Sequence, residues 1–298
     1  MEYETVFFSE NVALLATLGY PDAGEGPFPA IVLLHGHARH RNDGLDALSH
    51  RLNEAGFITL RFNFRGCGET MYERYNIICH TRCPEDAFNA VSFLMTRPRV
   101  DAQRIGIAGE SLGASTAIYA AGTDSRIKCA VSMAGLGDPE RNLRSHLDRR
   151  YGSDRFGKLL ELIERDRYQR VCTGHSEWLL STAIGDSSQE EADMIVCENT
   201  LDHTWGSANS NYMTVASLES LLKYKPLHVC ARITQPILFL HGSEDTVVDA
   251  QEGREMCAYV SSAIKEFRLL QGIDHNMPLH KKRDEVFECV TGWFSRYL

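Results

Sequence analysis

Short apolar runs alternate with helix-patterned segments along most of this chain, and this alternation constrains the fold more than any other feature. The runs are continuous enough to be strands covered on both faces, and the segments between them repeat apolar residues at helical spacing. Strands are predicted at 30–36, 57–64, 104–109, 127–135, 236–242 and 264–270, and helices at 43–55, 85–96, 112–121, 250–259 and 283–297. This order predicts an α/β fold with a mostly parallel sheet and helices on both faces.

Two regions depart from the alternation. Near the start of the chain, residues 5–8 and 12–18 predict two short strands of a hairpin. Within 136–233 strand-like runs are missing, and the apolar residues recur at helical spacing. We therefore expect a helical cap insertion there, between two central strands of a core formed by 1–135 and 234–298.

Charge and cysteine usage narrow the classes of partner and compartment. Acidic side chains outnumber Lys and Arg by 40 to 31, and the formal net charge of −9 argues against nucleic acid or an anionic membrane as a partner. The nine cysteines are odd in number and scattered, unlike the disulfide framework of a small secreted domain. With no signal peptide or membrane-length apolar run in the sequence, a cytoplasmic location is expected. Monomer and homodimer both stay open.

A serine between two glycines stands where a predicted strand meets a predicted helix. In the segment IAGESLGAS, Ser111 lies between Gly109 and Gly113. Gly-x-Ser-x-Gly in a strand–turn–helix context is the arrangement of a nucleophile elbow, a tight turn that exposes the serine oxygen. The helix that follows would place its positive dipole end beneath the reacting group. We therefore predict that Ser111 is a nucleophile.

A nucleophilic serine needs a base and an acid that orients the base, and both follow it along the chain. Asp245 comes just after the strand at 236–242, and His275 comes just after the strand at 264–270. Because the carboxyl ends of parallel strands meet at one edge of a sheet, we expect both side chains near Ser111. The order Ser, Asp, His is that of a catalytic triad on an open α/β sheet.

An oxyanion hole completes this constellation. One donor is expected to be the backbone N–H of Leu112, directly after the nucleophile. The other is expected from His37, in the loop that follows the strand at 30–36. Two preorganised N–H groups at this position would hold the negative charge that develops on a carbonyl oxygen during attack.

These motifs resemble those of the α/β-hydrolase superfamily, specifically its single-chain esterases and its dienelactone-hydrolase-like and acyl-peptidase-like members. The matching stretches are VLLHGHARHR, GFITLRFNFRGCGET, RVDAQRIGIAGESLGAS, PILFLHGSEDTVV and GIDH, spread over 31–135 and 234–298. The resemblance implies an eight-stranded core and the same roles for the serine, aspartate and histidine above. Glu110, Cys67 and Glu69 depart from the family pattern and leave the substrate open.

The reaction predicted from these residues is acyl transfer. A serine esterase would form an acyl-enzyme on Ser111 and would need no metal or organic cofactor. A small-molecule carboxylic ester is the leading substrate class, an amide or peptide is next, and C–C bond hydrolases and thioesterases share the same triad. Substrate specificity is expected from the insertion, where Trp178, Trp205 and Tyr212 are candidates to wall an apolar pocket.

The sequence also contains features that could indicate functions other than serine hydrolysis. His35, His37 and His40 have a metal-ligand spacing, although Arg39 occupies the position at which a metallo-hydrolase would need an aspartate. The segment 79–83, Cys-His-Thr-Arg-Cys, has no second ligand pair for zinc, and no phosphate-binding glycine motif occurs. A non-catalytic ligand-binding protein on the same fold is the alternative from another class.

Overall fold

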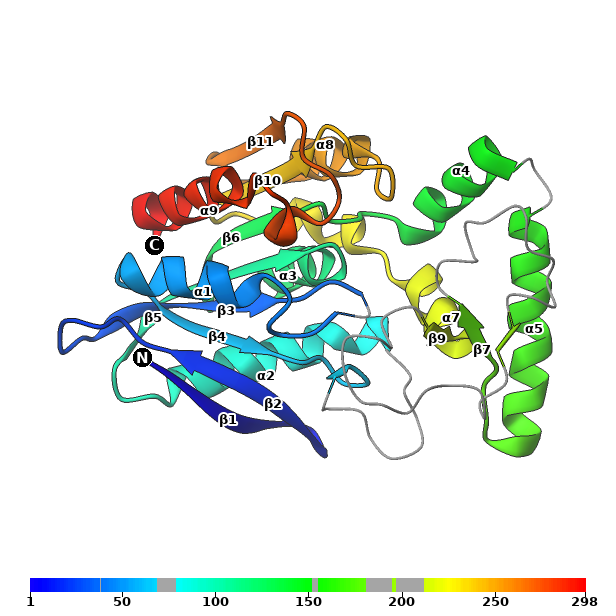
Figure 1. The fold of residues 1–298 in the computed structure, drawn as a ribbon, viewed down its shortest axis with the longest axis horizontal. Helices are drawn as coiled ribbons and strands as arrows, with labels where there is room; N and C mark the ends of the chain where they lie inside the picture. The colour runs from blue at the N-terminus through cyan, green and yellow to red at the C-terminus, as the bar shows by residue number, and fades with distance from the viewer. Residues whose placement is uncertain (38, 69–78, 152–154, 181–194, 197–211) are drawn as a thin grey trace.

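An eight-stranded sheet forms the centre of the computed structural model (Figure 1), which describes every residue except 38, 69–78, 152–154, 181–194 and 197–211. The strands of this sheet are β1 (Glu2–Ser9), β2 (Val12–Gly19), β3 (Phe28–Leu34), β4 (Ile58–Phe62), β5 (Val100–Glu110), β6 (Ile127–Met133), β10 (Ile237–Gly242) and β11 (Lys265–Leu270). Their order across the sheet is β1-β2-β4-β3-β5-β6-β10-β11. Pairing is antiparallel from β1 through β2 to β4 and parallel between all later neighbours. The predicted mostly parallel, eight-stranded sheet is confirmed.

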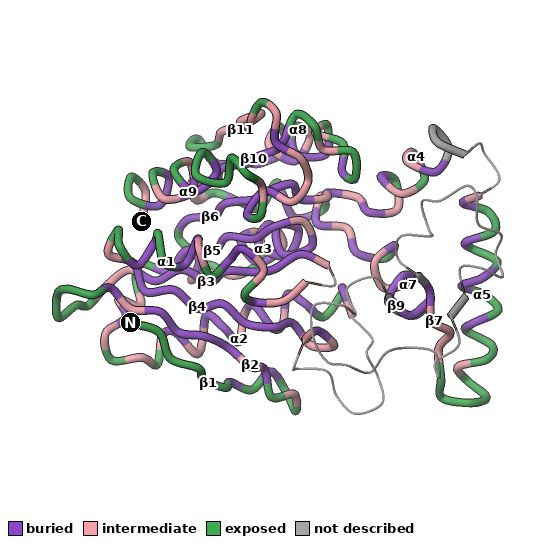
Figure 2. Tube along the Cα trace, viewed as in Figure 1, coloured by how far each residue is buried: buried purple, intermediate pink, exposed green. Residues whose placement is uncertain are grey.

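Helices cover both faces of this sheet. They are α1 (Leu45–Glu54), α2 (Cys83–Met95), α3 (Leu112–Thr123), α8 (Ala250–Tyr259) and α9 (Arg283–Tyr297). The side chains of α2, α3 and α8 pack in one apolar cluster with the sheet, and those of α1 and α9 pack in another. Figure 2 shows the result as a band of buried strands between helices whose outer sides are exposed.

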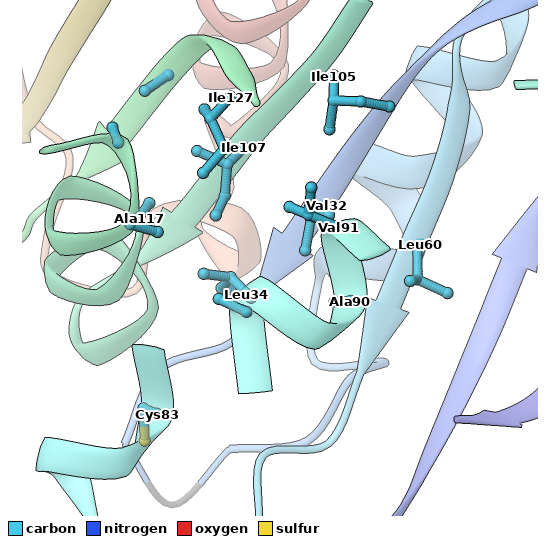
Figure 3. Close-up of a cluster of buried hydrophobic side chains, with 14 of the residues drawn as sticks. Val32, Leu34, Leu60, Cys83, Ala90, Val91, Ile105, Ile107, Ala117 and Ile127 are labelled. Atoms are coloured by element: carbon cyan, nitrogen blue, oxygen red, sulfur yellow. The ribbon is translucent and has the colours of Figure 1, made fainter. Parts of the chain in front are cut away.

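Alternation along the strands divides the core between these two faces. On β3, Ala30, Val32 and Leu34 belong to the cluster with α2 and α3, whereas Ile31 and Leu33 belong to the cluster with α1 and α9. All five side chains are fully buried, which explains why the strand is continuously apolar instead of alternating with polar residues. Figure 3 shows the first cluster, with Val32 and Leu34 between neighbouring strands and the helices α2 and α3.

Between β6 and β10, the 3-10 helix η6 (Pro226–Arg232) packs against α3 of the core. Helices α4 (Pro139–Tyr151), α5 (Arg155–Thr173) and α7 (Val215–Lys223) lie beyond the sheet, on the side toward which the parallel strands point (Figure 1). These helices share an apolar cluster of their own, which includes Phe156, Leu162 and Leu218. Helix α7 also packs against η2 (His80–Arg82), a short 3-10 helix of the core. Contact between the insertion and the core is therefore made close to the carboxyl edge of the sheet.

The expectation that this insertion lacks strands is wrong. A small antiparallel sheet, in the order β8-β7-β9, is formed by β7 (Trp178–Leu180), β8 (Ile195–Val196) and β9 (Tyr212–Thr214). Strands of two or three residues are too short to show a period-two pattern in the sequence, so they escape detection.

Over the ranges that the structure describes, no helix is both long enough and apolar enough to cross a membrane.

Candidate active site

Ser111 lies in a strained turn between the end of β5 and the start of α3. Its backbone has φ 52° and ψ −112°, in the left-handed half of the map that non-glycine residues rarely enter. The strain is held in place by a hydrogen bond of 2.8 Å from the Ser111 backbone N–H to the carbonyl oxygen of Met133 on β6. A strained backbone at a partly buried serine that contacts a histidine indicates a functional constraint on that residue.

The two glycines around Ser111 are required because three backbone segments meet there. A Cβ on Gly109 would lie under 3.0 Å from the backbone of Gly113, and a Cβ on Gly113 would lie under 3.0 Å from the carbonyl oxygen of Leu34. Strands β5 and β3 and the first turn of α3 therefore approach too closely for any side chain. This close approach is what forces the tight turn that carries Ser111.

His275 lies next to this serine although 164 residues separate the two along the chain. It lies in the loop between β11 and η7 (Met277–Leu279), beyond the carboxyl end of β11. Its Nε2 atom is 3.0 Å from Ser111 Oγ, and its Nδ1 atom is 2.8 Å from Asp245 Oδ2. The structure thus brings together the three residues that the sequence singled out, in one continuous chain of hydrogen bonds.

Asp245 is fixed in this chain by four polar contacts. Its Oδ1 accepts hydrogen bonds from the backbone N–H groups of Val247 and Val248, at 2.9 and 2.8 Å. Its Oδ2 faces His275 and also lies 3.1 Å from Nε2 of His241. Burial alone would raise the pKa of this carboxyl, but the hydrogen bonds from His241 and His275 outweigh it and hold the pKa well below its usual range. The side chain is therefore ionised while it faces His275.

Sequence reasoning missed His241, which is fully buried at the end of β10. Its Nε2 is also 3.0 Å from the carbonyl oxygen of Val248, so it ties the strand to the loop that carries Asp245. The available signal was a polar residue ending an apolar run, four positions before the predicted acid.

The loop after β3 lies directly against Ser111. A Cβ on Gly36 would lie 3.5 Å from Ser111 Cβ, which places the following residue, His37, beside the serine. His35 anchors this loop, because its Nε2 accepts a hydrogen bond of 3.0 Å from the backbone N–H of Phe64. Burial lowers the pKa of His35 to about 4, and the neutral ring is the form that can accept this bond.

His37 is held by a second histidine. The rings of His37 and His80 are stacked with centroids 5.1 Å apart, and His37 Nδ1 lies 3.0 Å from His80 Nε2. Burial lowers the pKa of His37 to about 4, so one ring nitrogen of this pair donates and the other accepts. Since His80 belongs to η2, which packs against α7, this pair connects the insertion to the loop beside Ser111.

The three histidines of the metal-like spacing make separate contacts. His35 binds the Phe64 N–H, His37 faces His80, and Nδ1 of His40 accepts a hydrogen bond from the Asn42 N–H. Within the described ranges, no group of three His, Cys, Asp or Glu side chains is placed to hold a metal ion. The geometry therefore does not support a metal site formed by His35, His37 and His40.

The residues proposed for the substrate pocket are placed only in part. Trp178 begins β7 and is half-buried, and Tyr212 begins β9. Trp205 and the side chain of Tyr212 lie outside the described part of the structure. Their assignment to the pocket stays a prediction.

Glu110, directly before Ser111, is a buried acid. It is 2% exposed, and its Oε2 atom has no hydrogen-bond partner among the described residues. Burial raises the pKa of this carboxyl to about 7, and the nearby side chains of His275 and Arg39 oppose that rise without cancelling it. At neutral pH the carboxyl is therefore close to half protonated.

This shift predicts a pH-dependent stability difference between the wild type and Glu110→Gln. The folded protein holds the Glu110 proton more tightly than the unfolded chain, so the stabilisation is present below pH 4.5 and is lost as the pH rises to about 7. The amide does not titrate. The free energy of unfolding of the wild type, relative to Glu110→Gln, should fall by about 3 kcal/mol across that range.

Urea unfolding of both proteins from pH 4.5 to above pH 7 measures this difference. Glu288→Gln removes an exposed carboxyl and serves as the control for loss of one acidic group. A difference between the wild type and Glu110→Gln that stays constant with pH would contradict the prediction.

Comparison with known proteins gives the same architecture. A family model described as serine aminopeptidase, S33, matches residues 26–281. An uncharacterised 31.7 kDa Escherichia coli protein from the traX-finO intergenic region is 26% identical over 291 residues, 97% of each chain. The polyketide transferase ATR5 of Stachybotrys chlorohalonatus is 26% identical over 263 residues, covering 86% of this chain and 84% of its own. The crystal structure of the α/β hydrolase GrgF from a Penicillium species superposes with a TM-score of 0.79 at 20% identity, over 100% of this chain and 99% of its own.

Proposed function

This chain belongs to the serine aminopeptidase, S33 family of α/β hydrolases, and we propose that it cleaves a carboxylic ester through an acyl-enzyme on Ser111. The observation that carries the proposal is the continuous hydrogen-bonded chain from Ser111 Oγ through His275 to Asp245, with spacings of 3.0 and 2.8 Å. A serine becomes nucleophilic when a base can remove its proton and a third group orients that base.

The reaction begins with attack of Ser111 Oγ on the ester carbonyl carbon. His275 Nε2 accepts the serine proton as the new C–O bond forms, and Asp245 stabilises the resulting imidazolium. The N–H groups of Leu112 and His37 hold the oxyanion of the tetrahedral intermediate. His275 then protonates the departing alcohol. Water attacks the acyl-enzyme with the same base, releasing the acid and restoring Ser111.

Cleavage of an ester needs no catalytic group beyond those already described in this site. An alcohol leaves more readily than an amine, so a site able to cleave an amide also cleaves a comparable ester. Amide cleavage would need assistance to an amine leaving group, and C–C bond cleavage would need a group that stabilises a carbanion, whereas the thiol of a thioester leaves at least as readily as an alcohol. The polyketide transferase relative suggests another variant, in which an acceptor other than water takes the acyl group.

The decisive experiment combines covalent labelling with a substrate panel. A fluorophosphonate should add once, on the tryptic peptide of residues 105–126, which contains Ser111. The wild type should hydrolyse nitrophenyl esters faster than aminoacyl anilides and should be insensitive to chelators. Labelling outside residues 105–126, or loss of activity with a chelator, would contradict the proposal, and a preference for anilides would move it to the amidase alternative.

A further inference from the structure

A cation outside the proposed catalytic machinery lies close to the nucleophile. Arg39 follows β3 in the same loop as His37, and its backbone N–H donates to the Gly36 carbonyl oxygen at 3.3 Å. Its Cγ lies 3.4 Å from the position that a Cβ on Gly36 would take, and Ser111 Cβ lies 3.5 Å from that same position. The stem of Arg39 therefore runs beside the reacting serine.

The guanidinium of Arg39 extends to the loop that carries the catalytic base. Its Nη2 donates a hydrogen bond to Oδ1 of Asn276, the residue after His275. This contact uses one of the five N–H donors of a guanidinium and leaves most of the planar fork available. Arg39 thus spans from the nucleophile to the histidine loop, and its side chain remains partly exposed.

Arg39 has no ion-pair partner among the residues that the structure describes, unlike its neighbours. Arg41 pairs with Glu4 at 2.7 Å, and Arg61 pairs with Glu2 at 2.5 Å. A guanidinium fork matches the geometry of a carboxylate and binds it through two parallel hydrogen bonds. The chain has a net charge of −9, so it has no general excess of basic side chains that would explain this arginine.

Three acids in this region, Glu110, Asp43 and Asp274, form no ion pair with Arg39 within the described part of the structure and have other surroundings. Glu110 is buried without a partner for Oε2, and its raised pKa leaves it only partly charged at neutral pH. Asp43 and Asp274 each accept a hydrogen bond of 2.9 Å from a backbone N–H, of His40 and Asn276 respectively. With respect to the residues that the structure describes, the fork of Arg39 therefore keeps an open position for an anion beside the reaction centre.

We propose that Arg39 binds a carboxylate of the substrate, so that the preferred ester carries an acid group close to the scissile bond. This inference rests on the proposed serine hydrolase activity and names its substrate class. A bidentate, charge-assisted contact in a partly buried site should favour an acidic ester over its neutral counterpart by about 10- to 100-fold in kcat/KM.

Matched esters that differ only in one charge test this proposal. For the acyl side they are mono-4-nitrophenyl glutarate and its methyl ester. For the leaving group they are 4-carboxyphenyl acetate and its methyl ester. The quantity measured is the ratio of kcat/KM for the acid to kcat/KM for the methyl ester, compared between the wild type and Arg39→Gln. Because intrinsic reactivity is the same in both proteins, it cancels from this comparison.

In Arg39→Gln the ratio should fall by about 10- to 100-fold for at least one pair. Arg232→Gln removes an exposed cation elsewhere with the same change in net charge and should keep the wild-type ratio. An Arg39→Gln ratio equal to that of the wild type overturns the proposal. This includes the case in which both rates fall together, which would make Arg39 a positioning residue for the histidine loop.

Measuring ligand binding in a variant that cannot turn the ester over tests the role of Arg39 separately from the proposed esterase activity. Calorimetric titration of Ser111→Ala with mono-4-nitrophenyl glutarate should give a Kd about 10-fold or more below that of the same variant carrying Arg39→Gln. Equal Kd values overturn the role of Arg39 whatever the enzyme hydrolyses. A difference in Kd without any ester hydrolysis by the wild type would support the anion site and refute the esterase.

Discussion

Replacing Ser111 by alanine is expected to lower kcat for ester hydrolysis by about 10⁶-fold. Alanine removes the oxygen that lies 3.0 Å from His275 Nε2 and that we propose as the attacking group. The backbone turn remains, because the constraint comes from the close approach of Gly109 and Gly113 and from the bond to Met133. Residual turnover would come from the N–H groups of Leu112 and His37 acting on a bound ester attacked by water.

Steady-state kinetics with a nitrophenyl ester measure this loss. Ser125→Ala, a change at an exposed serine, is the matched control and should keep wild-type activity. Circular dichroism and the unfolding midpoint of Ser111→Ala should match those of the wild type. A variant that folds and still retains more than about 1% of kcat would place the nucleophile on another residue.

The core elements could be predicted because their sequence signals are long and local. The helices predicted at 250–259 and 283–297 have the same bounds as α8 and α9. Strand β5 begins at Val100, four residues before the predicted start. The prediction missed this first part because the polar residues Asp101 and Gln103 interrupt the apolar pattern of the strand. The small sheet of the insertion was missed for the opposite reason, since its strands are too short to carry any pattern.

In the candidate site, too, some residues could be predicted from the sequence and others could not. Ser111, Asp245 and His275 could be selected because each follows a strand, and the carboxyl ends of parallel strands lie at one edge. The bond between Arg39 and Asn276 joins residues 237 positions apart, and no periodicity in the sequence encodes it. Burial without a hydrogen-bond partner, as at Glu110, is a property of the packed fold and has no local signature.

Asp245→Asn should lower kcat by about 10⁴-fold while leaving Ser111 in place. The two backbone N–H groups of Val247 and Val248 hold Oδ1 as the acceptor, so the amide NH₂ of asparagine would take the place of Oδ2 and face His275. His275 Nδ1 would then have to accept, and the ring proton would move to Nε2. An Nε2 that already carries a proton cannot remove one from Ser111 Oγ.

The changed tautomer of His275 gives Asp245→Asn a kinetic signature that simple loss of stability would not produce. The rate of fluorophosphonate labelling should fall in parallel with kcat, because both need deprotonation of Ser111, whereas KM should change little. Glu244→Gln, at the exposed neighbouring residue, is the matched control and should retain wild-type rates. If Asp245→Asn folds and keeps kcat within about 10-fold of the wild type, then Asp245 does not set the protonation state of His275. The buried His241–Asp245 contact would then serve only to fix the loop after β10.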